Sequence, residues 1–123
     1  MKKIGMLLTL CLALIMTACT TTLSSVHSSL DSDLQRSTSL ASDGSYIAIT
    51  MTRSCSRSDE SILCRESHAL DDILDGLGFE SNVRRRMGET RALDGRQTAE
   101  SGHFNVSWTF HPDNGLQVLF ESN

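Results

Sequence analysis

The chain carries little positive charge beyond its first residues. Its only lysines are Lys2 and Lys3, and the sequence from residue 19 onward contains nine arginines against fifteen acidic residues. Nucleic-acid binding requires clustered positive charge that neutralises phosphates. The acidic balance therefore argues against a nucleic-acid partner, and it provides no general attraction to anionic lipid.

The chain also lacks an apolar run long enough to cross a bilayer. The apolar segment at residues 4–18 would span only about 22 Å as a helix, which is short of the ~30 Å hydrocarbon core. A basic start, a short apolar centre and small residues at its end are typical of a secretory signal peptide. We therefore expect residues 1–18 to be removed from the mature protein.

The residue after this segment is a cysteine. Met16-Thr17-Ala18-Cys19 resembles the lipobox of bacterial lipoproteins, although Met16 stands where leucine is commonest. The resemblance implies cleavage between Ala18 and Cys19, diacylglycerol on the Cys19 sulfur and usually a further acyl chain on the new amino group. Two or three acyl chains hold a protein at a bilayer essentially permanently. The resemblance covers only the first nineteen residues, so it implies nothing about the fold.

The residue after the anchor bears on sorting. Thr20 follows Cys19, rather than the aspartate associated with inner-membrane retention in enteric-type bacteria. By this analogy we expect an outer-membrane anchor with the protein facing the periplasm.

Two cysteines remain in the mature chain, and they do not form a CxxC motif. Cys55 and Cys64 are separated by eight residues, with no histidine placed as a metal partner. A metal site and a reactive thiol are therefore weaker alternatives to a crosslink. Because an exported protein meets an oxidising compartment, we expect a disulfide that stabilises the fold by about 2–3 kcal/mol.

Residues 19–42 differ in composition from the rest of the chain. Twelve of the residues from 20 to 42 are Ser or Thr, and none is aromatic. Such a segment buries too little apolar surface to offset the entropy of ordering, so we expect a flexible tether with a reach of about 25–30 Å. One alternative remains open, a short helix that docks on the domain or on a partner. It is suggested by apolar residues at helical spacing, Leu23, Val26, Leu30 and Leu34.

The folded unit is expected at residues 43–123, beginning at the turn pair Asp43-Gly44. Residues 46–53 alternate as a strand with Ile47, Ile49 and Met51 on one side. A helix is expected within residues 60–75, ended by glycines that follow it. Its apolar stripe comprises Ile62, Leu63, Leu70, Ile73, Leu74 and Leu77, with Asp71, Asp72 and Asp75 facing solvent.

The next segments carry weaker signals. Residues 79–87 suit either a strand or a short helix, and we favour the strand. Residues 88–102 are polar and are expected to form a long loop with a bend at Asp94-Gly95.

The clearest pattern is a hairpin at the C-terminal end of the chain. Residues 103–111 alternate strictly between polar and apolar side chains, and the alternation resumes at Leu116 after a turn at residues 112–115. Only a five-residue loop keeps both apolar sets on one face, which predicts three cross-strand pairs. These are Phe110 with Leu116, Trp108 with Val118, and Val106 with Phe120. The expected fold is α+β, a small sheet with this hairpin and one packed helix, stapled by the disulfide.

No pattern in the sequence indicates catalysis, a cofactor or a metal. No GxSxG motif surrounds any serine, and His103 and His111 would stand about 26 Å apart on one strand. Arg84, Arg85 and Arg86 are the one run with an interaction character, because arginine suits bidentate contact with carboxylate or phosphate. The run is interpreted either as a solvated segment that balances the protein's own acids or as a contact patch for an acidic partner.

Anchor, tether and compact domain together suggest local capture of a protein at a membrane, since tethering raises effective concentration. This organisation resembles secretion pilotins, without a motif of any named family in the domain. We therefore expect a non-enzymatic adaptor of an envelope assembly (secretion, pilus or flagellar) that binds an envelope protein. The alternative is a ligand- or protein-binding lipoprotein such as an inhibitor, immunity or exclusion factor, and an envelope enzyme is disfavoured.

Overall fold

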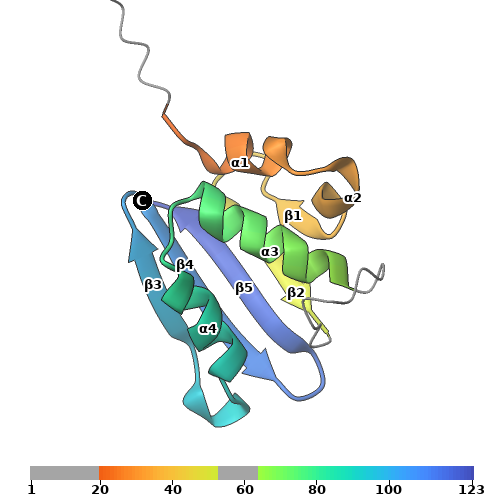
Figure 1. Ribbon diagram of the computed structural model, residues 1–123, viewed down its shortest axis with the longest axis vertical. Coiled ribbons are helices and arrows are strands. Elements are labelled where there is room, and N and C mark those ends of the chain that lie inside the picture. The colour runs from red at the N-terminus through yellow and green to blue at the C-terminus, as the bar shows by residue number, and fades with distance from the viewer. Residues whose placement is uncertain (1–19, 53–63) are drawn as a thin grey trace, which may run out of the picture.

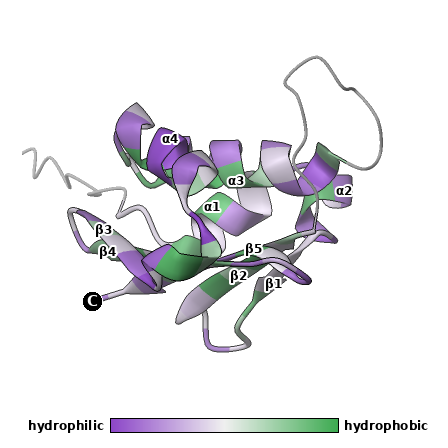
Figure 2. Cartoon of the chain, turned by 90° about the horizontal axis from the view of Figure 1, so that it is seen from below, coloured by the Kyte–Doolittle hydropathy of each residue, from purple (hydrophilic) through white to green (hydrophobic). Residues whose placement is uncertain are grey.

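The computed structural model describes residues 20–52 and 64–123 and shows an α+β fold of two layers (Figure 1). A five-stranded antiparallel sheet has the order β1-β2-β5-β4-β3, and the helices cover one of its faces (Figure 2). The elements in chain order are α1 (Leu23–Ser29), α2 (Ser32–Gln35), β1 (Thr38–Leu40), β2 (Tyr46–Met51), α3 (Arg65–Gly76), α4 (Ser81–Glu89), the 3-10 helix η2 (Ala92–Asp94), β3 (Gln97–Ser101), β4 (Phe104–His111) and β5 (Gly115–Ser122).

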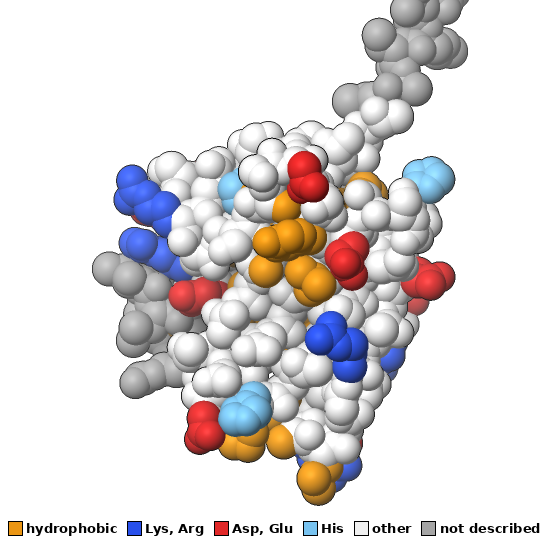
Figure 3. Space-filling view, turned by 180° about the vertical axis from the view of Figure 1, so that it is seen from behind, with side chains coloured by type: hydrophobic (Ala, Val, Ile, Leu, Met, Phe, Trp, Pro, Cys, Tyr) orange, Lys and Arg blue, Asp and Glu red, His pale blue; other side chains and the backbone are white. Residues whose placement is uncertain are grey.

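The hydrophobic core lies between the helices and the sheet. Trp108 and Phe120 are the largest of its fully buried side chains, and α3 supplies Leu70 and Ile73 from above them. The other face of the sheet is open (Figure 3), with a small apolar group where Ala48 of β2 pairs with Leu119 of β5. One solvated face is the usual state of an antiparallel sheet. Each helix within the described ranges is too short or too polar to span a bilayer.

The C-terminal hairpin has the predicted register. Phe110 pairs with Leu116, and the other two predicted pairs are also present. The ladder continues by one further pair, His111 with Gly115, so only residues 112–114 lie outside it. Side chains at residues 104, 106 and 108 are buried as expected, whereas Phe110 at the strand end is 38% exposed.

The first predicted strand and the long helix are confirmed in the described residues. In β2, Ile47, Ile49 and Met51 point into the core. Helix α3 ends at Gly76, and Gly78 follows with a φ of 74° that favours glycine. Residues 60–63, where the sequence predicts the start of this helix, lie outside the described part of the chain.

The preference for a strand at residues 79–87 is wrong, because α4 forms there. Val83 and Met87, four positions apart, are both buried, and this is helical spacing. A strand would have turned Ser81 and Arg85 inward as well, yet both are exposed. The domain therefore packs more than the one helix that the sequence predicted.

The expected long loop at residues 88–102 contains η2 and the edge strand β3. The side chains of β3 (QTAES) show no apolar alternation, so hydrophobic pattern could not reveal it. Its pairing with β4 is set by main-chain hydrogen bonds and by the tight turn at Gly102, whose φ is 56°.

The flexible tether expected at residues 19–42 is also incorrect over most of its length. Leu23, Val26 and Leu30 join the hydrophobic core, and β1 pairs with β2. The turn at Asp43-Gly44 therefore connects two strands and does not begin the domain. The folded unit starts near Thr22, and the alternative of a docked helix describes this region better.

The predicted disulfide has one partner within the described residues. Cys64 is buried at the start of α3, with 2% of its surface exposed. Cys55 lies outside the described residues, so the Cys55–Cys64 crosslink stays a prediction.

Gly115 is the position where the fold depends most directly on a missing side chain. Its φ is 77°, and an added Cβ would overlap the main-chain oxygen of Met51.

We expect Gly115→Ala to lower the free energy of unfolding by about 3 kcal/mol or more. The new methyl group would clash with the Met51 main chain, and alanine disfavours a positive φ. Gly88→Ala is the matched control, because a Cβ there meets nothing within 4 Å in α4. It should stabilise by about 0.5–1 kcal/mol. Urea denaturation followed by circular dichroism measures both, and equal stability of Gly115→Ala and wild type would contradict the close approach.

Candidate functional site

The three consecutive arginines lie on α4, where a helical turn spreads their side chains around the axis. Arg84 faces α3, Arg86 faces the sheet, and Arg85 is exposed. Among the described residues, Arg85 has no hydrogen-bond or ion-pair partner. The run therefore does not present three cations on one surface.

Arg84 joins α4 to α3. Its Nε donates to Oδ1 of Asp71 at 2.6 Å, and its Nη2 donates to Oγ of Ser67 at 2.9 Å. The Arg84 and Asp71 side chains are 30% and 39% exposed, so solvent screens the pair only in part. Asp71 is thus paired, whereas the sequence assigned it to the solvated face of the helix.

Arg86 lies over the side chain of Trp108. Its Cζ is 5.1 Å from the centroid of the ring, a cation–π distance, and its Nη2 donates to the carbonyl of Thr98 at 3.2 Å. Thr98 belongs to β3, the strand at the edge of the sheet. Arg86 therefore covers part of that edge.

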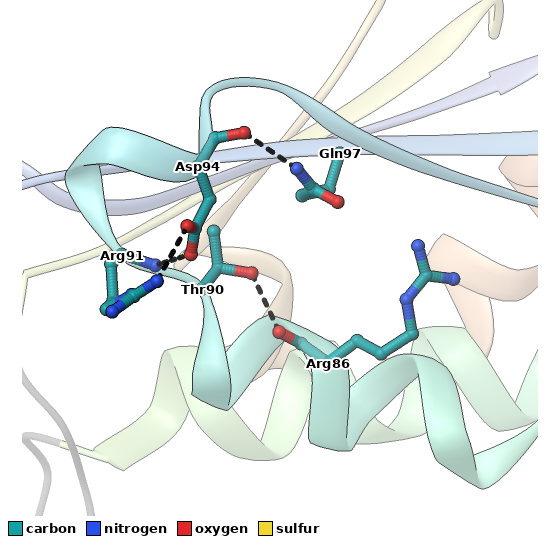
Figure 4. A network of polar contacts seen from close by, with 5 residues as sticks. All are labelled: Arg86, Thr90, Arg91, Asp94 and Gln97. Carbon is teal, nitrogen blue, oxygen red and sulfur yellow. Dashed lines mark hydrogen bonds and ion pairs between the residues drawn. The ribbon is translucent and has the colours of Figure 1, made fainter.

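Two groups of hydrogen bonds hold the connection between α4 and β3 (Figure 4). The Thr90 hydroxyl donates to the Arg86 carbonyl at 2.7 Å and accepts from Nε1 of Trp108 at 2.8 Å. Asp94 accepts from the Arg91 amide at 2.7 Å, and its own carbonyl accepts from Nε2 of Gln97 at 2.8 Å. The hydrogen bond from the Arg91 amide, and after it the bond from the Arg91 side chain, lowers the pKa of the Asp94 carboxyl below its ordinary value. The carboxylate is therefore ionised at neutral pH and caps η2.

A cavity with apolar and basic residues in its lining lies where the hairpin tip meets the end of α4. Its volume is about 510 Å³, and it is called here the distal cavity. Its apolar wall contains Met51, Met87 and Leu116, and two cations, Arg84 and Arg91, border it. Both arginines are already paired, Arg84 with Asp71 and Arg91 with Asp94, so the site suits chiefly an apolar side chain. The remaining described residues around it are Thr52, Gly88, Glu89, Thr90, Phe110, Pro112 and Gly115.

A second hollow is acidic. Asp31, Asp33 and Asp72 border an open space of about 540 Å³ together with His68. Burial is the main cause that raises the pKa of Asp72. Within residues 20–52 and 64–123, no group of three or more His, Cys, Asp or Glu side chains is arranged to hold a metal ion.

The histidines do not assemble a reactive centre in the described part of the chain. His103 precedes β4 and His111 ends it, so the two lie at opposite ends of the strand. Nδ1 of His111 accepts from the Asp113 amide at 3.1 Å, which is a turn contact. The hydrogen bonds between described residues do not join a histidine to a serine hydroxyl.

Comparison with protein-family models, with curated proteins and with solved structures gives no match for this chain.

Sequence reasoning did not find the distal cavity or the bond between Thr90 and Trp108. The cavity is built by short pieces of β2, α4, the following loop and the hairpin, which no local pattern brings together. The strict alternation in β4 did place Trp108 in the core, and a buried indole usually finds an acceptor. The sequence therefore signals that Trp108 needs a hydrogen-bond acceptor, but it does not identify Thr90 as that acceptor.

The bond from Trp108 to Thr90 can be tested directly. Thr90→Val removes the acceptor and leaves a buried indole N–H unpaired, which should lower the free energy of unfolding by about 1–3 kcal/mol. Thr98→Val is the matched control, because Thr98 is exposed on the edge strand and should change stability by less than about 0.5 kcal/mol. Urea unfolding followed by the fluorescence of the single tryptophan measures both variants. Equal stability of Thr90→Val and Thr98→Val would show that this hydrogen bond contributes nothing.

Proposed function

We propose that the protein is a lipoprotein anchored through Cys19 in the outer membrane and facing the periplasm, where it acts as a non-enzymatic adaptor of an envelope assembly. The observation that carries this proposal is the lipobox-like Met16-Thr17-Ala18-Cys19, placed immediately before the folded domain. Secretion, pilus and flagellar systems are the assemblies that such an anchored module would serve.

The surfaces of the domain support binding in preference to catalysis. Arg85 is exposed and has no partner among the described residues, and the distal cavity has an apolar wall. An exposed arginine is suited to the carboxylates of a protein partner, and apolar surface is suited to the core of an interface.

The second candidate function is a ligand- or protein-binding lipoprotein, such as an inhibitor, immunity or exclusion factor. One observation favours it, the apolar wall that Met51, Met87 and Leu116 give the distal cavity. Small-molecule sites are typically concave and lined mainly by hydrophobic side chains. A ligand in the cavity would support this candidate, and an assembly component bound at α4 would support the adaptor.

The anchor predicts a specific pattern of labelling in a bacterial host. Wild-type protein should incorporate labelled palmitate and fractionate with the outer membrane, because acylation at Cys19 holds it there. Cys19→Ser should lose both properties. Cys11→Ser, in the middle of the signal peptide, is the matched control and should behave as wild type. Labelling that persists in Cys19→Ser would refute the anchor.

The adaptor proposal predicts that Arg85 contributes to partner capture. Mature protein should recover a component of a secretion, pilus or flagellar assembly from detergent-solubilised envelopes, and Arg85→Ser should weaken that capture about tenfold. Arg36→Ser is the control, because Arg36 is another exposed arginine, paired only within the α2 region with Asp33 at 3.6 Å. Equal capture by both variants would remove Arg85 from the binding surface, and recovery of no such component would count against the adaptor.

A further inference from the structure

We infer that the folded domain stands directly on the bilayer, with the end that carries α1 at the lipid headgroups and the distal cavity turned away from the membrane. This inference rests on the proposed function, because it requires lipid on Cys19. It adds the height and the orientation of the domain, which the anchor alone does not specify.

The connection between the lipid and the domain is very short. Only residues 20–22 separate Cys19 from Leu23, the first residue of α1. Since an extended chain covers at most about 3.6 Å per residue, Leu23 lies within about 14 Å of the lipidated cysteine. A flexible tether over residues 19–42 would have allowed about twice that separation on average.

Helix α1 is fixed to the core, so the connection cannot lengthen without local unfolding. Leu23 is 1% exposed, and Val26 is 6% exposed. A Val26 methyl group packs so closely on α3 that a Cβ added to Gly76 would lie 2.9 Å from it. The N-terminus of α1 is closed by a capping box, in which Thr22 and Ser25 each bind the other's amide at 3.1 and 2.9 Å.

The same end of the molecule gathers two turns and the C-terminus. Ser24 of α1 lies beside Gly44 in the turn before β2, and the Ser122 amide donates to the Ser45 carbonyl at 3.4 Å. The Asn123 amide donates to the carbonyl of His103 at 2.8 Å, next to the β3–β4 turn. Figure 1 shows these segments together at the end where residues 20–22 leave the domain. We call this the proximal end.

The chemistry of α1 at the proximal end suits a headgroup surface. Residues 20–30 contain no lysine, arginine or acidic residue, and seven of these eleven residues are exposed Ser or Thr. Hydroxyls can hydrogen bond with phosphate and ester oxygens. Asp43 in the turn before β2 and the C-terminal carboxylate of Asn123 add negative charge at the same end, so this end suits neutral headgroups better than anionic ones. The covalent lipid, rather than charge, would supply the attachment.

The distal cavity lies at the other end of the sheet. Strands β4 and β5 each have eight residues, a length of about 26 Å at 3.2–3.4 Å per residue. The tip that joins them borders the cavity, whereas Ser122 and Phe104 lie at the proximal end. A partner that uses the cavity must therefore reach within about 40 Å of the bilayer, from the aqueous side.

The absence of lysine from the mature chain makes the test site-specific. Lysine introduced at His103, in the proximal β3–β4 turn, or at Asn114, in the distal hairpin turn, gives a single side-chain amine for a fluorophore. Each lipidated protein is reconstituted into phosphatidylcholine vesicles that contain a lipid with a nitroxide quencher on its headgroup. The probe at His103→Lys should be quenched several-fold more than the probe at Asn114→Lys.

A spacer variant tests the cause of this difference. Twenty Gly and Ser residues inserted between Thr20 and Thr21 give the domain a further reach of about 25 Å. The quenching at His103→Lys should then fall to the level of Asn114→Lys. Equal quenching of the two probes without the spacer, or no effect of the spacer on quenching, would overturn the proposed orientation. If the protein still binds vesicles in either case, the proposed anchor stands. Protein that carries no acyl mass and does not bind vesicles would overturn the proposed anchor itself.

Discussion

The burial of Leu23, Val26 and Leu30 against α3 and the sheet is the contact on which the wider arrangement depends, because it makes a serine-rich segment part of the domain. Each buried aliphatic side chain contributes roughly 1.5–3 kcal/mol, which can offset the entropy of ordering a short helix. Gly76 permits this packing by leaving room for the Val26 methyl groups. The position of α1 in turn decides how far the core lies from Cys19.

The parts of the fold that sequence could predict are those in which side-chain pattern and structure have the same period. The alternation in β4 and β5 predicts the hairpin register, because a shift by one residue would turn the apolar side chains of one strand, with Trp108 or Phe120 among them, to the solvated face. The β3 strand had no such pattern, since its five residues are held by main-chain pairing at the edge of the sheet. In residues 20–42 the average composition predicts a tether, whereas the spacing of four apolar residues predicts the docked helix that describes the segment better.

The arginine run shows the same limit for the candidate site. Three adjacent arginines suggest one cationic patch, but these residues form a helix and not the strand that we favour from sequence, and a helix separates neighbouring side chains by about 100°. Two of the three cations are engaged within the domain, Arg84 with Asp71 and Arg86 with Trp108 and Thr98. What remains for a partner is Arg85 and the border of the distal cavity, and the cavity depends on tertiary contacts that no local pattern contains.

The proposed anchor and the fold together would give the two ends of one small domain different roles. At the proximal end, a capped helix with hydroxyl side chains continues from the three residues that follow Cys19. At the other end, Met51, Met87 and Leu116 lie beside arginines, about one strand length away. Because the connection is short and α1 is packed into the core, the lipid would restrict the height of the domain and its tilt, as well as its location. Capture of a partner would then be favoured by local concentration and also by orientation, since the binding end would face the aqueous compartment in every copy.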